Sequence, residues 1–216
     1  MAAPPALLST AAPGRLGARQ ATRRKADAVL VGAASLIAGK GFEATTLRDV
    51  GRELDVSLGG MYYYFSSKDD LLFQIQQRTF SALLAAQVKT AAFPGRPEQR
   101  LERLLVGHLA FFEWHPNEMK ICTFELESLK GAQYRQILLI RRRYYRLMAG
   151  AVAALTGSRP RKGRDSARSR HLTLFIFGML NWAFMWYRPA KDGPVDSLAA
   201  HMIDLIQHGV GKRATG

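Results

Sequence analysis

The sequence predicts an all-α protein with an N-terminal three-helix domain and a C-terminal helical domain. Apolar residues recur at the three- and four-residue spacing of amphipathic helices from residue 22 to residue 210. Two short helical segments follow one another between residues 45 and 65. A Pro- and Gly-containing stretch at residues 92–97 then interrupts the periodicity and divides the chain in two.

The first predicted helix runs from Thr22 to about Gly39, and Gly41 supplies a C-terminal stop. Residues 1–21 are rich in Ala, Pro and Gly with scattered Arg and lack helical periodicity, so we expect a disordered arm. The apolar face of the helix consists of Ala26, Val29, Leu30, Ala33, Leu36 and Ile37.

The next two predicted helices are short and are joined by a tight turn. Thr46 and Asp49 have the spacing of a capping box, in which each side chain satisfies the backbone N–H of the other residue. Asp55-Val56 forms the turn, and Ser57 is placed to cap the second helix, which extends through Phe65. Two short helices on a tight turn, anchored by longer helices, are the helix-turn-helix pattern.

The rotation of the second short helix follows from the 100° step between successive helical residues. If Met61 and Phe65, an i, i+4 pair, face the core, Tyr63 points almost directly away from it. Tyr62 then lies on one flank, and Tyr64 lies close to the buried side. At least one tyrosine hydroxyl is therefore presented outward.

Glycines at the start of this helix favour contact with a second surface. Gly59 and Gly60 lie in the first turn, where the lack of a side chain allows the backbone to approach another molecule closely. A phosphate backbone suits the free N–H groups and the neighbouring tyrosine hydroxyls. The alternative, a helical hairpin packed inside a larger protein, leaves Tyr63 and the glycines without a role.

At these residues the chain resembles the TetR family of bacterial transcriptional regulators. The resemblance runs from about Arg23 to Phe80, and its specific part is V-S-x-G-x-M-Y-Y-Y-F-x-S-K-x-x-L. It implies an all-α homodimer that binds double-stranded operator DNA through residues 22–82 and binds a small effector and its partner subunit through residues 83–216. It also implies DNA contacts at Thr46, Arg48, Ser57, Gly59, Gly60, Tyr62, Tyr63 and Lys68.

Two residues depart from the family pattern. Leu58 stands where the family often has lysine, and Gly60 where it often has threonine, serine or alanine. Both changes remove side chains from the reading helix. An effector-binding or interaction protein with degraded sequence-specific DNA recognition is therefore an alternative to a DNA-binding repressor.

The remaining helices are expected to follow in order along the chain. Each is bounded by Pro, Gly or a capping residue. The predicted segments are Ser67 to about Ala91, Pro97 to before Pro116, a helix capped by Asn117, Gln133–Thr156, Leu172–Tyr187, and a last helix after Gly193-Pro194.

The formal net charge of +14 is unevenly distributed. Residues 26–70 carry four basic and seven acidic groups, whereas residues 131–170 carry eleven basic residues and one acid, Asp165. The basic block includes Arg142 and Arg146, an i, i+4 pair, and continues through a predicted loop at residues 158–170. It fits a solvated face, a site for a phosphorylated ligand, or contact with flanking DNA. The arginines of the N-terminal arm either follow a minor groove or belong to an idle tail.

The segment Leu172–Tyr187 is apolar nearly all round, and it is too short to span a bilayer. We expect it to be buried on every face, on one side by its own core or a ligand cavity and on the other by a partner subunit. Together with the last helix of each chain it would form a four-helix dimer interface.

The string from Phe177 to Trp182, followed by Trp186-Tyr187-Arg188-Pro189, resembles the C-terminal domain of TetR-type repressors that govern fatty-acid, sterol-ring and aromatic degradation. This resemblance implies an acyl-coenzyme A effector; the alternative is a small apolar inducer such as a drug or an aromatic compound. The expected effector-binding residues are Phe111, Phe112, Trp114, Arg142, Arg146, Trp182 and Trp186.

No pattern of a catalytic site is present in the sequence. Cys122 is the single cysteine, and the five histidines lack metal-ligand spacing. Nucleophile-elbow, P-loop and dinucleotide-binding motifs are absent. We therefore expect a cytoplasmic, nucleoid-associated regulator that is not an enzyme, with no metal, no cofactor and no membrane partner.

Overall fold

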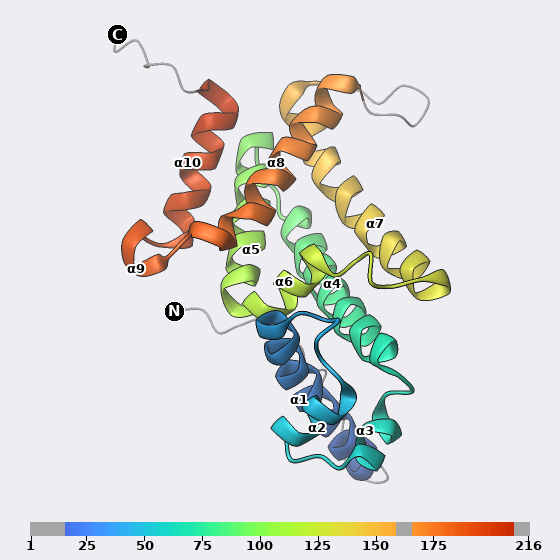
Figure 1. Cartoon of the computed structure of the whole chain (residues 1–216). Helices are drawn as coiled ribbons and strands as arrows, with labels where there is room; N and C mark the ends of the chain where they lie inside the picture. The colour runs from blue at the N-terminus through green and yellow to red at the C-terminus, as the bar shows by residue number, and fades with distance from the viewer. Residues whose placement is uncertain (1–15, 159–165, 210–216) are drawn as a thin grey trace. The chain divides into compact units, whose positions relative to one another are not determined.

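The computed structural model describes residues 16–158 and 166–209, and it describes side chains from Arg24 onward. These described residues form ten helices and contain no strand, which confirms the all-α prediction (Figure 1). The helices are α1 (Leu16–Lys40), α2 (Leu47–Glu53), α3 (Leu58–Tyr64), α4 (Lys68–Ala92), α5 (Pro97–Trp114), α6 (Pro116–Phe124), α7 (Gly131–Thr156), α8 (Ala167–Trp186), α9 (Pro189–Asp192) and α10 (Val195–His208).

The chain divides into two compact units. The first contains the chain up to Ala82 together with residues 115–141, and the second contains residues 83–114 and the chain from Arg142 onward. Residues 115–141 join the first unit because α6 packs on α1, where Lys120 Nζ donates to the carbonyl of Ala38 at 2.7 Å. The predicted domain limits at residues 82 and 83 follow chain order rather than packing, and they remain a prediction.

Two helices, α1 and α8, begin several residues earlier than the sequence predicts. Helix α1 begins at Leu16 rather than Thr22, and residues 1–15 of the expected arm lie outside the described residues. Helix α8 begins at Ala167, where the hydroxyl of Ser166 accepts a hydrogen bond from the N–H of Ser169 at 3.1 Å. Arg168 and Arg170 are therefore helical, and residues 159–165 of the predicted loop lie outside the described residues.

The predicted Asn117 cap is wrong. Helix α6 begins at Pro116, two residues before the start that an Asn117 cap implies, and His115 occupies the N-cap position without a side-chain capping hydrogen bond. Proline suits the first helical position because its φ is fixed near the helical value and because the N–H that it lacks has no partner within the helix at that position.

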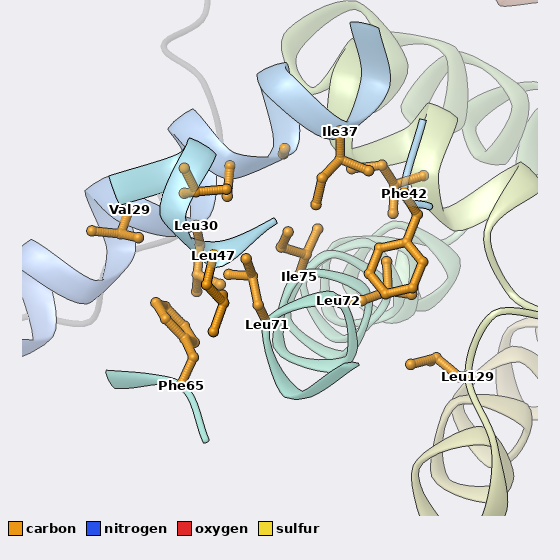
Figure 2. Close-up of a cluster of buried hydrophobic side chains, with 14 of the residues drawn as sticks. Val29, Leu30, Ile37, Phe42, Leu47, Phe65, Leu71, Leu72, Ile75 and Leu129 are labelled. Carbon is orange, nitrogen blue, oxygen red and sulfur yellow. The ribbon is translucent and has the colours of Figure 1, made fainter. Parts of the chain in front are cut away.

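The core of the first unit gathers apolar side chains from α1, α2, α3, α4, α6 and α7. Figure 2 shows Leu71, Leu72 and Ile75 of α4 facing Leu30 and Ile37 of α1. All five are buried, so the hydrophobic effect holds α4 against α1. Leu129, before α7, belongs to the same cluster.

The core of the second unit centres on α5, which packs against α8 and α10. One face of α8 is buried and includes Thr173, Ile176 and Leu180. The opposite face is exposed, with Phe175 and Trp182 at 66% and 56%. One side of this helix therefore packs within the chain, as predicted, and burial of the other side by a partner subunit stays a prediction. In the described parts of the chain, no helix is long and apolar enough to cross a membrane.

Candidate functional site

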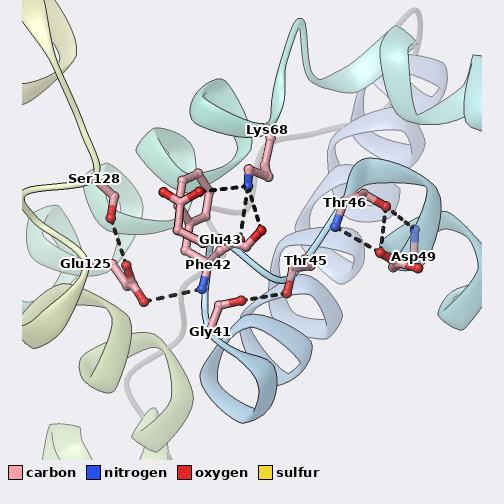
Figure 3. Close-up of polar contacts among 9 residues, drawn as sticks. All are labelled: Gly41, Phe42, Glu43, Thr45, Thr46, Asp49, Lys68, Glu125 and Ser128. Carbon is pink, nitrogen blue, oxygen red and sulfur yellow. Dashed lines mark hydrogen bonds and ion pairs between the residues drawn. The ribbon is translucent and has the colours of Figure 1, made fainter.

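The start of α2 is fixed by a capping box. Thr46 Oγ1 accepts from the N–H of Asp49 at 3.1 Å, and Asp49 Oδ2 accepts from the N–H of Thr46 at 3.0 Å (Figure 3). The Thr46 hydroxyl also donates to Asp49 Oδ2 and lowers the pKa of that carboxyl. The sequence prediction for this cap is confirmed.

The turn between α2 and α3 depends on a close backbone approach at Gly51. The N–H of Val56 donates to the carbonyl of Gly51 at 2.8 Å, and Asp55 takes a positive φ of 52°. A Cβ on Gly51 would lie 2.5 Å from the Val56 carbonyl oxygen. Ser57 then caps α3 by accepting from the N–H of Gly60 at 3.1 Å, as the sequence predicts.

Helix α3 has the predicted rotation. Met61 and Phe65 are fully buried, whereas Tyr63 and Tyr62 are 73% and 57% exposed. Tyr64 is partly buried and packs against the core. Two adjacent tyrosines therefore face solvent on a short helix that is anchored on its other side.

The two glycines of α3 have different structural reasons. A Cβ on Gly59 would have no atom within 4 Å, so internal packing does not require glycine there. A Cβ on Gly60 would lie 3.1 Å from Val56 Cγ1 and 3.2 Å from Ser57 Oγ. The departure from the family pattern at Gly60 therefore relieves crowding around the Ser57 cap.

An open hollow of about 490 Å³ lies beside α3 and the start of α2. Four of the eight predicted DNA-binding residues line it, namely Thr46, Arg48, Tyr62 and Lys68. Residues of three different helix starts are thus brought to one surface. Its other lining residues are Leu47, Leu58, Ser66 and Ser67.

Lys68 is engaged within the protein. Its Nζ donates to the carbonyls of Phe42 at 3.1 Å and Glu43 at 3.3 Å, and it lies 4.3 Å from the centroid of the Phe42 ring (Figure 3). The Glu43 carboxylate is 3.8 Å away but its side chain is 88% exposed. Lys68 therefore ties the start of α4 to the segment that leads into α2, and its direct DNA contact stays a prediction.

The predicted effector residues occupy two environments. Phe111 and Phe112 of α5 are buried, and the Phe112 ring stacks on that of Phe184 with centroids 5.1 Å apart. The three predicted tryptophans are about half exposed: Trp114, Trp182 and Trp186. The aromatic set therefore does not line one common interior space.

A pocket of about 350 Å³ in the second unit is lined by α4, α5 and α7. Its wall is apolar except for Arg100 and Arg146. Arg146 is one of the predicted pair, whereas Arg142 is exposed and is not among the lining residues. Sequence reasoning missed Arg100 because it lies outside the basic block and no sequence pattern distinguishes it. The lining residues are Ala91, Pro97, Arg100, Leu104, Arg146, Leu147, Gly150, Ala151 and Ala154.

Metal-binding and thiol chemistry have no support in the geometry. Within residues 16–158 and 166–209, no group of three His, Cys, Asp or Glu side chains could hold a metal ion. Cys122 is buried, and burial raises the pKa of its thiol, which disfavours the reactive thiolate.

Two family models match most of the chain. Residues 29–75 match the bacterial regulatory proteins of the tetR family, and residues 94–210 match the Tetracyclin repressor-like C-terminal domain. The repressor KstR of Mycolicibacterium smegmatis is 37% identical over 105 residues, which are 48% of each chain. The match thus spans about half the length of this relative. The repressor KstR2 of Rhodococcus jostii is 22% identical over 82% of this chain and 87% of its own.

Solved structures share the fold at low identity. A TetR-family regulator from Bordetella parapertussis has a TM-score of 0.79 at 21% identity, covering 86% of this chain and 95% of that one. AibR in complex with isovaleryl coenzyme A and operator DNA has a TM-score of 0.71 at 21% identity, covering 83% and 96%. The KstR2 structure of Mycobacterium tuberculosis has 0.74 at 19%, covering 88% and 96%. The chain described here belongs to the tetR family of bacterial regulatory proteins, a family of helix-turn-helix transcriptional regulators.

Proposed function

We propose that this protein is a repressor that binds a pseudo-palindromic operator as a homodimer and leaves it when a small effector binds. The carrying observation is the anchoring of α3: Met61 and Phe65 hold one side in the core, while Tyr62 and Tyr63 face solvent. An exposed face on a rigidly held second helix is what a recognition helix needs to enter the major groove. Such a regulator acts in the cytoplasm, at the nucleoid.

The exposed residues have two expected roles in DNA binding, contact with phosphates and contact with bases. Arg48 and Tyr63 are exposed and suit phosphate oxygens, which position a protein on DNA without reading bases. Tyr62 and Leu58 line the hollow beside α3. We assign contact with base edges to these two side chains. Because Leu58 and Gly60 offer no hydrogen bonds, specificity would come from Tyr62, from apolar contact and from DNA shape.

The exposed side of α8 supports dimerisation. Phe175, Trp182 and Trp186 expose between 50% and 66% of their area along this one helix. A patch of large aromatic side chains marks a contact surface. The partner that the family implies is a second copy of this chain. Leu205 of α10, which is 41% exposed, would extend the contact surface.

The pocket in the second unit supports an anionic amphiphile as effector. Its apolar wall fits an acyl chain, and Arg100 and Arg146 fit phosphate or carboxylate oxygens. The related AibR has been solved with isovaleryl coenzyme A and operator DNA. An acyl-coenzyme A thioester combines both chemistries. The protein would release the operator if the bound thioester favours a conformation in which the two reading helices no longer match successive major grooves.

Calorimetry with three compounds tests the effector class: dodecanoyl-coenzyme A, dodecanoic acid and coenzyme A alone. We expect the thioester to bind most tightly and the combined Arg100→Ala and Arg146→Ala change to weaken it about tenfold or more, as for lost charge-assisted hydrogen bonds. Arg142→Ala is the matched control, because Arg142 does not line the pocket. Tight binding of the free acid, unchanged in the double variant, would instead indicate a small apolar inducer.

A further inference from the structure

Two fully buried polar side chains of the second unit each have one polar atom without a partner. His108 and Gln87 are each 1% exposed. His108 Nδ1 is 2.7 Å from the hydroxyl of Tyr144, and Gln87 Nε2 donates to the carbonyl of Leu104 at 3.1 Å. Among the described residues, His108 Nε2 and Gln87 Oε1 have no hydrogen-bond partner. Buried polar atoms left unpaired cost free energy, so each such atom needs a reason.

Helical spacing places these two residues about one turn away from residues that line the arginine-lined pocket. Leu104 lines the pocket, and His108 follows it by one turn on the same face of α5. Ala91 also lines the pocket, and Gln87 precedes it by one turn on α4. On α7, Tyr144 precedes the lining residue Leu147 by three residues. Each of the three helices thus carries a pocket-lining residue within about one turn of His108, Gln87 or Tyr144.

Gly107, the residue before His108 on α5, leaves room for the Gln87 side chain. A Cβ on Gly107 would lie 3.1 Å from Gln87 Nε2 and 3.3 Å from Gln87 Oε1. The amide therefore packs directly on the α5 backbone, in the turn that also carries His108. This close approach fixes Gln87 Oε1 in the interior.

Aromatic rings lie beside His108 and Tyr144. The ring of His108 lies 5.6 Å from that of Phe112, and the ring of Tyr144 lies 5.5 Å from that of Phe177. Burial lowers the pKa of His108 to about 3, so the imidazole is neutral near pH 7. It offers a hydrogen bond within an apolar space rather than a charge.

We propose that the effector carries a hydroxyl or ketone oxygen on its apolar part, and that His108 Nε2–H donates a hydrogen bond to this oxygen. Tyr144 is the positioning residue: its hydroxyl donates to Nδ1, which places the imidazole proton on Nε2. Gln87 Oε1 is the acceptor for a hydroxyl proton. A hydroxyl therefore pairs both free atoms, and a ketone pairs one. This inference rests on the proposed effector pocket and adds to it a requirement for oxygen.

The test is calorimetry with three series of coenzyme A thioesters: unsubstituted dodecanoyl, and dodecanoyl carrying a hydroxyl or a ketone at each successive carbon. At one position of the chain, we expect the oxygenated ester to bind about tenfold more tightly than the unsubstituted ester, as for one buried hydrogen bond. His108→Phe should abolish this preference, measured as the ratio of the affinities for the oxygenated and the unsubstituted ester.

Two further variants separate recognition from packing. Tyr144→Phe keeps the ring but removes the hydroxyl that sets the imidazole tautomer, and should reduce the preference severalfold. Tyr134→Phe, on the same helix but in the first unit, should leave the preference unchanged. Circular dichroism confirms that each variant is folded.

The outcomes divide clearly. Equal affinity of the wild type for all three series would overturn the inference. This result is expected if the two atoms only hold an internal water. An equal loss for all series in His108→Phe would also overturn it, because the histidine would then be a packing residue. If the unsubstituted ester binds and releases the operator, such a failure leaves the proposed function intact. If no thioester binds, the proposed effector class itself fails.

Discussion

Replacing Lys68 with methionine should destabilise the first unit, because the ammonium group joins two parts of its backbone. Nζ donates to the carbonyls of Phe42 and Glu43 and lies over the Phe42 ring. Methionine keeps an unbranched chain of similar length but removes the charge and the donors. The segment before α2 would then lose its tie to α4.

The magnitude follows from the exposure of each contact. The hydrogen bond to the part-buried Phe42 carbonyl is charge-assisted and contributes about 1–1.5 kcal/mol. The cation–π contact adds about 0.5–1 kcal/mol. The ion pair with the exposed Glu43 side chain adds close to nothing. We therefore expect a loss of about 2 kcal/mol in the free energy of unfolding.

Urea denaturation of Lys68→Met measures this loss, and Lys89→Met is the control because Lys89 is exposed on the same helix. Salt titration of DNA binding gives a second readout, since each lost phosphate contact flattens the log–log slope by about one. An internal role predicts an unchanged slope. A flattened slope with a stability change below about 0.5 kcal/mol would refute the reasoning and make Lys68 a phosphate contact.

Tyr63→Phe should leave the unfolding free energy unchanged, because the side chain is 73% exposed, and should weaken binding to all DNA sequences about equally; a changed operator preference would contradict a phosphate role. Trp182→Glu places a charge on the exposed face of α8 and should yield monomers or aggregates in sedimentation, whereas a stable dimer would contradict that interface. His108 makes stability depend on pH: its native pKa of about 3 lies below the usual value of 6.5, so the unfolded chain binds one more proton between these values. Wild type should therefore lose about 2 kcal/mol more than His108→Phe when the pH falls from about 7 to about 5, and equal losses would contradict the neutral, buried imidazole.

Local signals in the sequence predicted the motif correctly. The capping box at Thr46 and Asp49 and the cap at Ser57 depend on residues three positions apart, so they can be identified without tertiary information. The rotation of α3 follows from the i, i+4 relation of Met61 and Phe65. These features determine the exposed surface to which we assign the proposed operator contact.

Contacts between distant segments could not be predicted in the same way. Lys68 donates to carbonyls 25 and 26 residues earlier, and His108 meets Tyr144 at a separation of 36 residues. Arg100 was missed because a single arginine on a helix has no distinguishing pattern. Arg100 and Arg146 come together only because both line the pocket, through the packing of α5 with α7.

The central claim is that the exposed face of α3 binds a specific operator and that an effector releases it. Fluorescence anisotropy tests this directly, with a labelled duplex from the DNA upstream of the gene and a shuffled duplex of equal composition. We expect binding to the upstream duplex at least about a thousandfold tighter than to the shuffled one, and dissociation on addition of dodecanoyl-coenzyme A. Equal affinity for the two duplexes would contradict sequence-specific recognition by this helix.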